Sequence, residues 1–298
     1  MKNLFKGVCP VINVPFAEDG EVDIQGMRNI IEFTLREGCE SLAIFAFNSE
    51  PHKMSSSEKD RVLIEFLKAV NHRANTLVGV IENSIRGSVE FARLVQENGG
   101  DGVILYPPSL STPSGEKLLL YFKSIAESVD IPVMIQDNPR STGVTMSTDF
   151  LSRAFKEIKN FQFIKVECPL PTRKIADLVR LTDGELKCYS GNGGIFAIDA
   201  FNSGAWGIMP GVSTVGRFVK MYRYFTDGQI DKARDIFENI LPLVWYEDQS
   251  LEFYISCEKA LLKKLGIIKN AVSREPASEL DDYSLRELFL LHERLKKI

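Results

Sequence analysis

The sequence predicts an α/β fold, a (β/α)8 TIM barrel followed by a C-terminal helical extension. Short runs of β-branched and apolar residues alternate with amphipathic helical stretches eight times, without a long linker or a low-complexity segment. Such alternation is typical of parallel strands joined by crossover helices. Eight units close a barrel of about 250 residues, which leaves a helical remainder in a chain of 298 residues. An open doubly wound sheet fits less well, because no glycine-rich phosphate-binding loop follows the first strand.

The first two units carry clear start signals for their helices. The first strand is expected at Gly7–Phe16, and Asp23 then has the position of a helix N-cap. Apolar residues recur after it at spacings of three and four, the pattern of a helix with one buried face. The second strand is expected at Ser41–Phe47. Ser55 with Glu58 three residues later forms a capping box, which predicts the start of the next helix.

The same alternation continues through the eighth strand. The remaining strands are predicted at Thr76–Ile81, Gly102–Tyr106, Pro132–Asp137, Phe161–Glu167, Leu186–Ser190 and Ala205–Met209, and the helices between them at Ser88–Gln96, Glu116–Ser128, Thr148–Ile158, Thr172–Leu181 and Ile195–Phe201. Three later stretches with helical apolar spacing are Gly228–Leu243, Leu251–Leu265 and Tyr283–Lys296. We therefore expect the barrel at residues 1–225 and the helical extension at residues 226–298.

Composition argues against several classes of partner. The chain is 44% hydrophobic and 26% charged, its formal net charge is −4, and it has no run rich in lysine and arginine. This balance disfavours nucleic acid or an anionic membrane surface as the main partner. No apolar run approaches the roughly 18 residues of a membrane span. The start of the chain lacks the apolar core of a signal peptide, so we expect a cytoplasmic protein.

Cysteine and histidine usage argues against a disulfide framework and a metal centre. The five cysteines are an odd number, widely spaced and without a C-x-x-C pair, which is typical of reduced cytosolic thiols. None of the three histidines has a further ligand at metal-binding spacing. The glycine-rich motifs of nucleotide sites are also missing. We expect no metal and no cofactor.

A lysine in the sixth strand is the leading candidate for chemistry. Lys165 lies in Phe161–Glu167, which reads as a strand buried on both faces. Burial disfavours a charged ammonium group, and a neutral amine can condense with a ketone to a Schiff base. Alternatively, Lys165 extends its charge to solvent or pairs with Glu167. The position near the carboxyl end of a barrel strand, where active sites of this fold gather, favours the Schiff base.

Polar residues also follow the second strand. The loop contains Asn48, Ser49, Glu50 and His52. Its backbone N–H groups and the Ser49 hydroxyl are candidates to hold a substrate carboxylate. The alternative is an ordinary loop of turn-forming residues before a helix. A nucleophilic serine is not indicated, because the sequence has no G-x-S-x-G elbow.

Two further strand ends complete the candidate site. The fifth strand ends at Gln136 and Asp137, and the seventh is followed by Gly191 and Asn192, where glycine permits close approach of a ligand. Glu167 shares a strand face with Lys165 and is a candidate to orient it, to transfer protons or to pair with another barrel residue.

Taken together, these residues resemble the pyruvate-type class I aldolases and dehydratases, the family of dihydrodipicolinate synthase and N-acetylneuraminate lyase. The resemblance covers essentially the whole chain: Gly7-Val8, Pro15-Phe16 and Asp19-Gly20 at the first strand, Ile164-Lys165 at the lysine strand, and Lys259-Ala260-Leu261-Leu262 and Arg274-Glu275-Pro276 near the C-terminus. It implies that Lys165 forms the Schiff base and that the protein is a homotetramer.

Departures from the family pattern indicate a particular branch. Ala46-Phe47-Asn48-Ser49-Glu50 replaces a Gly-Thr-Thr-Gly-Glu-like loop, and Gln136 stands where the synthase and the lyase have a proton-shuttling tyrosine. A tyrosine from a neighbouring subunit has no counterpart at Pro107, Pro108 or Ser109. Ser49-Glu50, Gln136-Asp137-Asn138-Pro139 and Lys165-Val166-Glu167 are instead similar to the 2-keto-3-deoxy-L-arabonate dehydratases.

The resemblance implies a small-molecule 2-keto acid substrate. The expected reaction is dehydration of 2-keto-3-deoxy-L-arabonate to 2-oxoglutarate semialdehyde, with Lys165, Gln136 and Glu167 as catalytic residues. The substrate would contact the second-strand loop, Asp137, Gly191 and Asn192. Alternatives are a pyruvate-dependent aldolase, 4-hydroxy-tetrahydrodipicolinate synthase activity or, in a different class, a non-catalytic sugar-acid-binding regulator.

Overall fold

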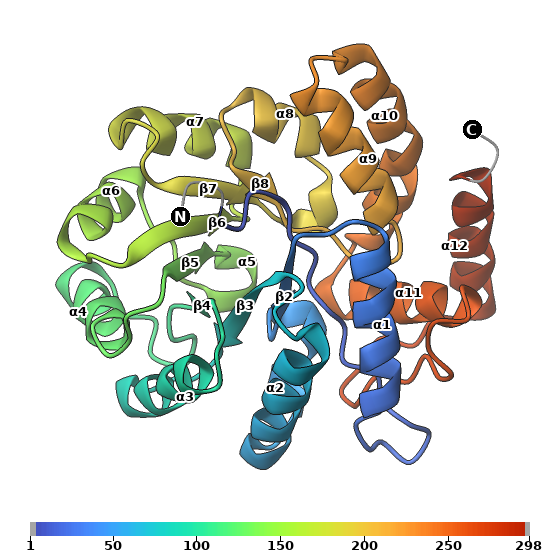
Figure 1. Ribbon diagram of the computed structural model, residues 1–298, viewed down its shortest axis with the longest axis horizontal. Coiled ribbons are helices and arrows are strands. Elements are labelled where there is room, and N and C mark those ends of the chain that lie inside the picture. The colour runs from blue at the N-terminus through green and yellow to red at the C-terminus, as the bar shows by residue number, and fades with distance from the viewer. Residues whose placement is uncertain (1–3, 296–298) are drawn as a thin grey trace.

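The computed structural model describes residues 4–295, which form a ring of helices around a parallel barrel (Figure 1). The strands are β1 (Gly7–Val8), β2 (Ser41–Ile44), β3 (Asn75–Val80), β4 (Gly102–Leu105), β5 (Val133–Asp137), β6 (Phe161–Val166), β7 (Lys187–Ser190) and β8 (Gly207–Ile208). All neighbours in the order β1-β8-β7-β6-β5-β4-β3-β2 pair in parallel. The predicted (β/α)8 barrel is thus confirmed.

Helices connect the strands and continue beyond them. Their bounds are α1 (Ile24–Arg36), α2 (Ser56–Val70), α3 (Ile85–Glu97), α4 (Gly115–Ala126), α5 (Pro139–Thr142), α6 (Thr148–Glu157), α7 (Pro171–Leu181), α8 (Ala197–Asn202), α9 (Val215–Thr226), α10 (Ile230–Glu247), α11 (Leu251–Lys264) and α12 (Asp282–Arg294). Short 3-10 turns are η1 (Phe47–Ser49), η2 (Pro51–Lys53) and η3 (Asn192–Gly194). No range had been predicted for α9, which follows β8, and the predicted last residue of the final helix, Lys296, lies outside the described residues.

The barrel closes between the first two strands through an irregular segment. A bridge joins Val11 to Ala43, and Ala43 exchanges backbone hydrogen bonds with the chain beside it, donating to Pro10 (2.9 Å) and accepting from Ile12 (2.7 Å). The prediction of one long strand at Gly7–Phe16 was wrong, since β1 ends at Val8. The reason is that Pro10 and Pro15 have no N–H group to donate to a ladder.

Local capping signals set the helix starts as predicted. The Asp23 carboxylate accepts a hydrogen bond from the backbone N–H of Gly26 at 2.8 Å, at the N-terminus of α1. At α2, Ser55 and Glu58 form the reciprocal capping box. Each cap satisfies N–H groups that have no partner within their own helix.

The core has two layers, one between strands and helices and one inside the barrel. The inner layer consists of Phe5, Cys9, Val11, Ala43, Ala46, Leu77, Ile104, Tyr106, Met134, Phe163, Tyr189 and Met209. Phe163 belongs to it, and side chains two residues apart on a strand share a face. The side chains of Lys165 and Glu167 therefore point into the barrel like that of Phe163, nearer its carboxyl end.

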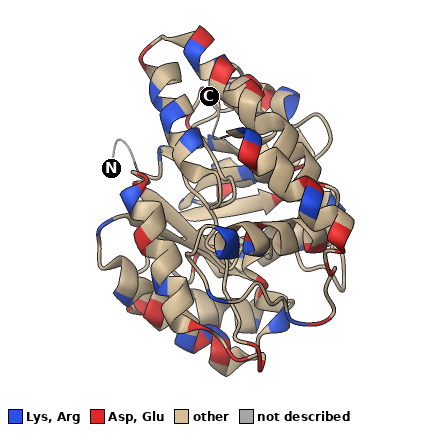
Figure 2. Ribbon diagram, turned by 90° about the vertical axis from the view of Figure 1, so that its right-hand side faces the viewer, with Lys and Arg blue, Asp and Glu red and all other residues tan. Residues whose placement is uncertain are grey.

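The last helices pack on one side of the barrel (Figure 1). Helix α10 packs on α9, and α11 contacts η1 in the loop after β2. This contact brings the C-terminal extension to the barrel mouth. Acidic and basic residues alternate along the helices that face the viewer in Figure 2. Within residues 4–295, no helix is both long and apolar enough to cross a membrane.

Candidate active site

A pocket opens at the carboxyl ends of the strands. It is lined by Val11, Phe47, Asn48, Gln136, Asn138, Arg140, Ser141, Lys165, Glu167, Asn192, Gly193, Met209, Asp248, Leu251 and Tyr254. Five of the predicted site residues meet here: Asn48, Gln136, Lys165, Glu167 and Asn192. The other lining residues come largely from the loop after β5 and from the start of α11.

Lys165 and Glu167 form an ion pair at the floor of the pocket. The lysine is only 5% exposed, and its Nζ lies 3.1 Å from Glu167 Oε1. The pairing that we considered as an alternative to the Schiff base is therefore present, within a pocket that a ligand can enter. The two functions are compatible, because a carboxylate beside the amine can receive the proton that the amine must lose before it attacks a ketone.

Glu167 collects hydrogen bonds from three further groups. Gln136 Nε2 donates to it at 2.5 Å, Asn138 Nδ2 at 3.0 Å and the backbone N–H of Asn192 at 2.9 Å. Burial by itself would raise the pKa of Glu167, but the charge of Lys165 and the hydrogen bonds from Asn192, Lys165 and Asn138 outweigh it, and the pKa is lowered. Glu167 is accordingly an anion that binds Lys165 in the resting protein.

Gln136 occupies the strand-five position that the resemblance assigns to a tyrosine. Its amide N–H group is used by Glu167, while its Oε1 is buried and has no hydrogen-bond partner among the described residues. A buried acceptor without a partner is unfavourable. A hydroxyl group of a bound ligand could satisfy it.

Ser49 does not line the pocket, although Asn48 beside it does. Its hydroxyl donates to the backbone carbonyl of Ile12 at 2.6 Å and accepts from the N–H of Phe45 at 3.0 Å. Ser49 is fully buried, so these bonds fix the loop against the closing segment of the barrel. The hydroxyl is thus already bonded to the backbone, and its contact with substrate stays a prediction.

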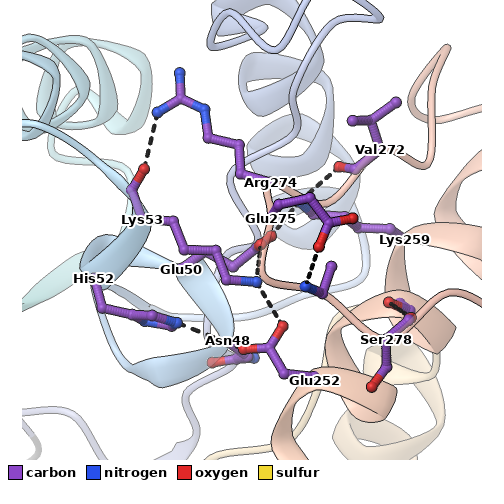
Figure 3. A network of polar contacts seen from close by, with 12 residues as sticks. Asn48, Glu50, His52, Lys53, Glu252, Lys259, Val272, Arg274, Glu275 and Ser278 are labelled. Atoms are coloured by element: carbon purple, nitrogen blue, oxygen red, sulfur yellow. Dashed lines mark hydrogen bonds and ion pairs between the residues drawn. The ribbon is translucent and has the colours of Figure 1, made fainter.

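Glu50 belongs to a buried network that links the same loop to α11 (Figure 3). Its carboxylate pairs with Lys259 and, at 3.1 Å, with Lys53. Lys53 also reaches Glu252 at 2.5 Å, and His52 Nε2 lies 3.5 Å from Glu252. Glu50 has φ of 56°, in the left-handed region. Neither Glu50 nor His52 lines the pocket, and the network holds the loop in place from behind.

Asp137 and Gly191 also lie beside the pocket without lining it. The Asp137 carboxylate is buried and pairs with Lys174 at 2.6 Å; burial raises its pKa, although Lys174 acts in the opposite direction. At Gly191, an added Cβ would lie 2.1 Å from Glu167 Oε1. The absence of a side chain at Gly191 therefore makes room for the Glu167 carboxylate.

The mouth of the pocket carries a pair, Arg140 and Asp248, that is not among the predicted site residues. Arg140, at the start of α5, lies 3.8 Å from Asp248 and donates to the backbone carbonyl of Gln249 at 2.7 Å. Asp248, Leu251 and Tyr254 come from the end of α10 and from α11. No sequence pattern singles out these three residues, because their place at the pocket depends on the docking of α11, in which residues 254–262 are all buried.

Comparison with known proteins places the fold and the site in one family. A family model described as the dihydrodipicolinate synthetase family matches residues 4–293. The chain belongs to the dihydrodipicolinate synthetase family. This is a family of lyases, and the match spans the barrel and most of the last helix.

Individual members of the dihydrodipicolinate synthetase family match over nearly the whole chain. An L-2-keto-3-deoxyarabonate dehydratase of Azospirillum brasilense is 26% identical over 295 residues, covering 97% of this chain and 94% of the relative. A 4-hydroxy-tetrahydrodipicolinate synthase of Syntrophus aciditrophicus is 29% identical, covering 96% of each. The crystal structure of dihydrodipicolinate synthase from Rhodopseudomonas palustris superposes with a TM-score of 0.91 at 28% identity, covering 97% of each chain.

Proposed function

We propose that this protein is a Schiff-base-forming lyase that dehydrates a 2-keto-3-deoxy sugar acid. The substrate we propose is 2-keto-3-deoxy-L-arabonate, and the product is 2-oxoglutarate semialdehyde. One observation carries the proposal: the nearly buried amine of Lys165 opens into a pocket with the carboxylate of Glu167 3.1 Å away. Membership of a lyase family and the similarity to a dehydratase of that substrate support it.

The first step is condensation at the substrate ketone. Lys165 loses a proton, its nitrogen attacks C2, and loss of water gives an iminium. The substrate carboxylate would lie against the η1 turn, whose backbone and Asn48 side chain face the pocket. Ser49 and Glu50 support this turn through the contacts described above.

The second step is removal of a proton from C3. The iminium acidifies this position, because the electron pair left on C3 is delocalised into an enamine. Glu167 is the carboxylate that lines the pocket beside Lys165. Once the lysine is part of a neutral enamine, the positive charge that lowers the pKa of Glu167 is gone, so the carboxyl group is then able to keep the proton.

The third step breaks the C4–O bond. The enamine electrons form a C3–C4 double bond as the C4 hydroxyl leaves as water, and the nitrogen becomes an iminium again. A proton moves from C5 to C3, which leaves an enol at C4–C5. The enol loses its O–H proton as C4 takes up a proton, which gives the aldehyde, and hydrolysis of the iminium releases the semialdehyde and the free lysine. The C4 hydroxyl needs a proton to leave as water, and these steps do not yet name its donor.

Charge at the pocket mouth favours an uncharged substrate tail. Arg140 is shared between Asp248 and a backbone carbonyl, so part of its hydrogen-bonding capacity is already used. The tail of 2-keto-3-deoxy-L-arabonate carries hydroxyl groups and no second carboxylate. A substrate with a distal carboxylate, as in the runner-up synthase activity, would compete with Asp248 for Arg140.

Reductive trapping tests the proposal. The protein is incubated with pyruvate or with 2-keto-3-deoxy-L-arabonate, borohydride is added, and the adduct is mapped by mass spectrometry. We expect a stable secondary amine on Lys165 with both compounds, and semialdehyde without pyruvate in untreated samples of the sugar acid. Lys165→Arg is the matched control, since it keeps the positive charge beside Glu167.

Other outcomes would identify the alternatives. Pyruvate and an aldehyde as products would identify an aldolase. Binding of the sugar acid that survives in Lys165→Arg, with no adduct in either form, would contradict the Schiff base and favour a non-catalytic regulator.

A further inference from the structure

A tyrosine from the C-terminal extension reaches the pocket that the barrel lysine opens into. Tyr254 lies on α11 and is 8% exposed, and it lines the pocket with Lys165 and Glu167. Its hydroxyl makes no hydrogen bond within the part of the chain that the structure describes. A phenol buried to this degree normally has a partner, so this hydroxyl is free to bond to a ligand.

Two glycines leave room for the Tyr254 hydroxyl. A Cβ added at Gly211 would lie 2.5 Å from the Tyr254 oxygen and 2.5 Å from Glu258 Oε1, so the two oxygen atoms are close neighbours. A Cβ at Gly193 would lie 3.5 Å from the same hydroxyl. Gly193 and Gly191 belong to one turn after β7, and Glu167 packs on the Gly191 side of it. The turn therefore has the Glu167 carboxylate beside one glycine and the Tyr254 hydroxyl beside another.

The surroundings keep the Tyr254 phenol protonated. Burial raises its pKa well above the usual value, and the negative charges of Glu258, Glu247, Asp248 and Glu167 raise it further. A phenol with a raised pKa stays a hydrogen-bond donor over the whole physiological range.

The Glu258 carboxylate behind Tyr254 is already bonded to other groups. It accepts from the N–H of Val212 (2.8 Å) and from the N–H (3.1 Å) and hydroxyl (2.6 Å) of Ser213. The Tyr254 hydroxyl forms no hydrogen bond with this carboxylate, and Tyr254 lines the pocket, so its proton is available to a ligand there.

We propose that Tyr254 donates the proton that the C4 hydroxyl takes up as it leaves. The inference rests on the proposed dehydration and supplies its missing acid, since Gln136 replaces the strand-five tyrosine. The C3 proton passes to Glu167, the O–H bond of Tyr254 breaks as the C4–O bond breaks, and the hydroxyl departs as water. Glu167 then returns its proton to the phenolate through a water molecule, so both groups are restored.

Replacing Tyr254 by phenylalanine tests this role. With Tyr254→Phe we expect kcat for 2-keto-3-deoxy-L-arabonate to fall roughly 100-fold or more, the usual effect of losing a general acid, with little change in KM. Two earlier steps should survive: trapping of pyruvate on Lys165 by borohydride, and exchange of the pyruvate methyl protons in D2O followed by NMR. Exchange needs the enamine but no leaving group, so a merely structural defect would slow it together with kcat.

A second tyrosine gives the matched control. Tyr246, on α10, donates its hydroxyl to the Ser284 carbonyl at 3.3 Å and does not line the pocket. Tyr246→Phe should turn over substrate like the wild type. Unchanged kcat in Tyr254→Phe would overturn the proposed role of Tyr254, and so would equal losses of exchange and turnover. A wild-type protein that forms the adduct but releases no semialdehyde would overturn the dehydration itself, and the role of Tyr254 with it.

Discussion

Two lysines in this protein are buried beside a glutamate, one at the end of β6 and one on α11. Lys165 pairs with Glu167 and lines the pocket. Lys259 pairs with Glu50, donates to the Val272 carbonyl at 2.9 Å and does not line that pocket. Burial lowers the pKa of Lys259 to about 8, although Glu50 acts in the opposite direction. A lowered pKa alone would therefore mark Lys259 as a candidate nucleophile.

The comparison teaches that access distinguishes a reactive lysine from a structural one. Perturbed pKa values gather at active sites, but buried structural ion pairs produce them as well. The side chain of Lys259 has no exposed surface, and a keto acid cannot reach it. Lys165 has a second feature that Lys259 lacks, a carboxylate partner that itself lines the pocket. The β6 region is thus suited to chemistry, and the α11 junction to holding the loop after β2.

The sharpest test of this contrast is removal of the lysine that lines the pocket. Lys165→Ala should lower kcat on the order of 10⁴–10⁶-fold, the size of effect seen when a covalent nucleophile is lost, and should abolish the borohydride adduct. The measurement is steady-state turnover with adduct mapping. An adduct that persisted in this variant, on Lys259 or elsewhere, would break the comparison.

The partner of Lys165, Glu167, should matter more for removal of the C3 proton than for adduct formation. Glu167→Gln removes the base while keeping hydrogen-bonding capacity towards Asn138 and Lys165. We expect kcat to fall by about 10²–10⁴-fold and the pyruvate adduct to persist. Exchange of the pyruvate methyl protons in D2O should slow with kcat, in contrast to Tyr254→Phe. Full exchange in Glu167→Gln would assign the C3 proton to another group.

The ion pair between Lys259 and Glu50 should matter for the stability of the fold. Lys259→Met leaves Glu50 with Lys53 as its partner in a buried site, so the free energy of unfolding should fall by roughly 3–5 kcal/mol. Adding Glu50→Gln should recover part of the loss, because the buried charge is then removed. Denaturant titration measures both variants, and borohydride trapping on Lys165 should persist wherever the protein is folded. No loss of stability would show that Lys259 does not anchor the loop.

Local sequence patterns predict the strands and the helix starts, but they do not predict the site contacts that depend on how distant segments pack. The barrel follows from eight repeats of one pattern, and the helix starts from the caps at Asp23 and Ser55. Lys165 stands out because a lysine interrupts an apolar strand. The commitment of the Ser49 hydroxyl to the Ile12 carbonyl depends on how the barrel closes, and no local pattern encodes it. Tyr254 is 89 positions from Lys165 in the chain, and only the docking of α11 brings it to the pocket.

The smallest expected effect concerns the outer edge of the α11 junction. Arg274 donates to the Lys53 carbonyl at 3.0 Å and pairs with Glu58. The hydrogen bond from Arg274 to the Glu58 carboxylate lowers the pKa of Glu58 to about 2. A carboxylate with a lowered pKa adds stability above its ordinary pKa, near 4.5, and loses it as the pH falls towards about 2. Because the pair is partly exposed, Arg274→Met should cost only about 1 kcal/mol at pH 7.

The pH dependence tests the cause of this loss. Denaturant titrations of wild type and Arg274→Met at pH 7, 5, 4 and 3 should show a stability difference that shrinks below about pH 4.5, because Glu58 takes up a proton in the unfolded chain there while the native wild-type carboxylate stays ionised. A difference that stayed constant over this range would assign the loss to the Arg274 contacts with backbone carbonyls instead. In either case the Lys165 adduct should form at the wild-type level at pH 7, since Arg274 supports the loop from outside and does not line the pocket.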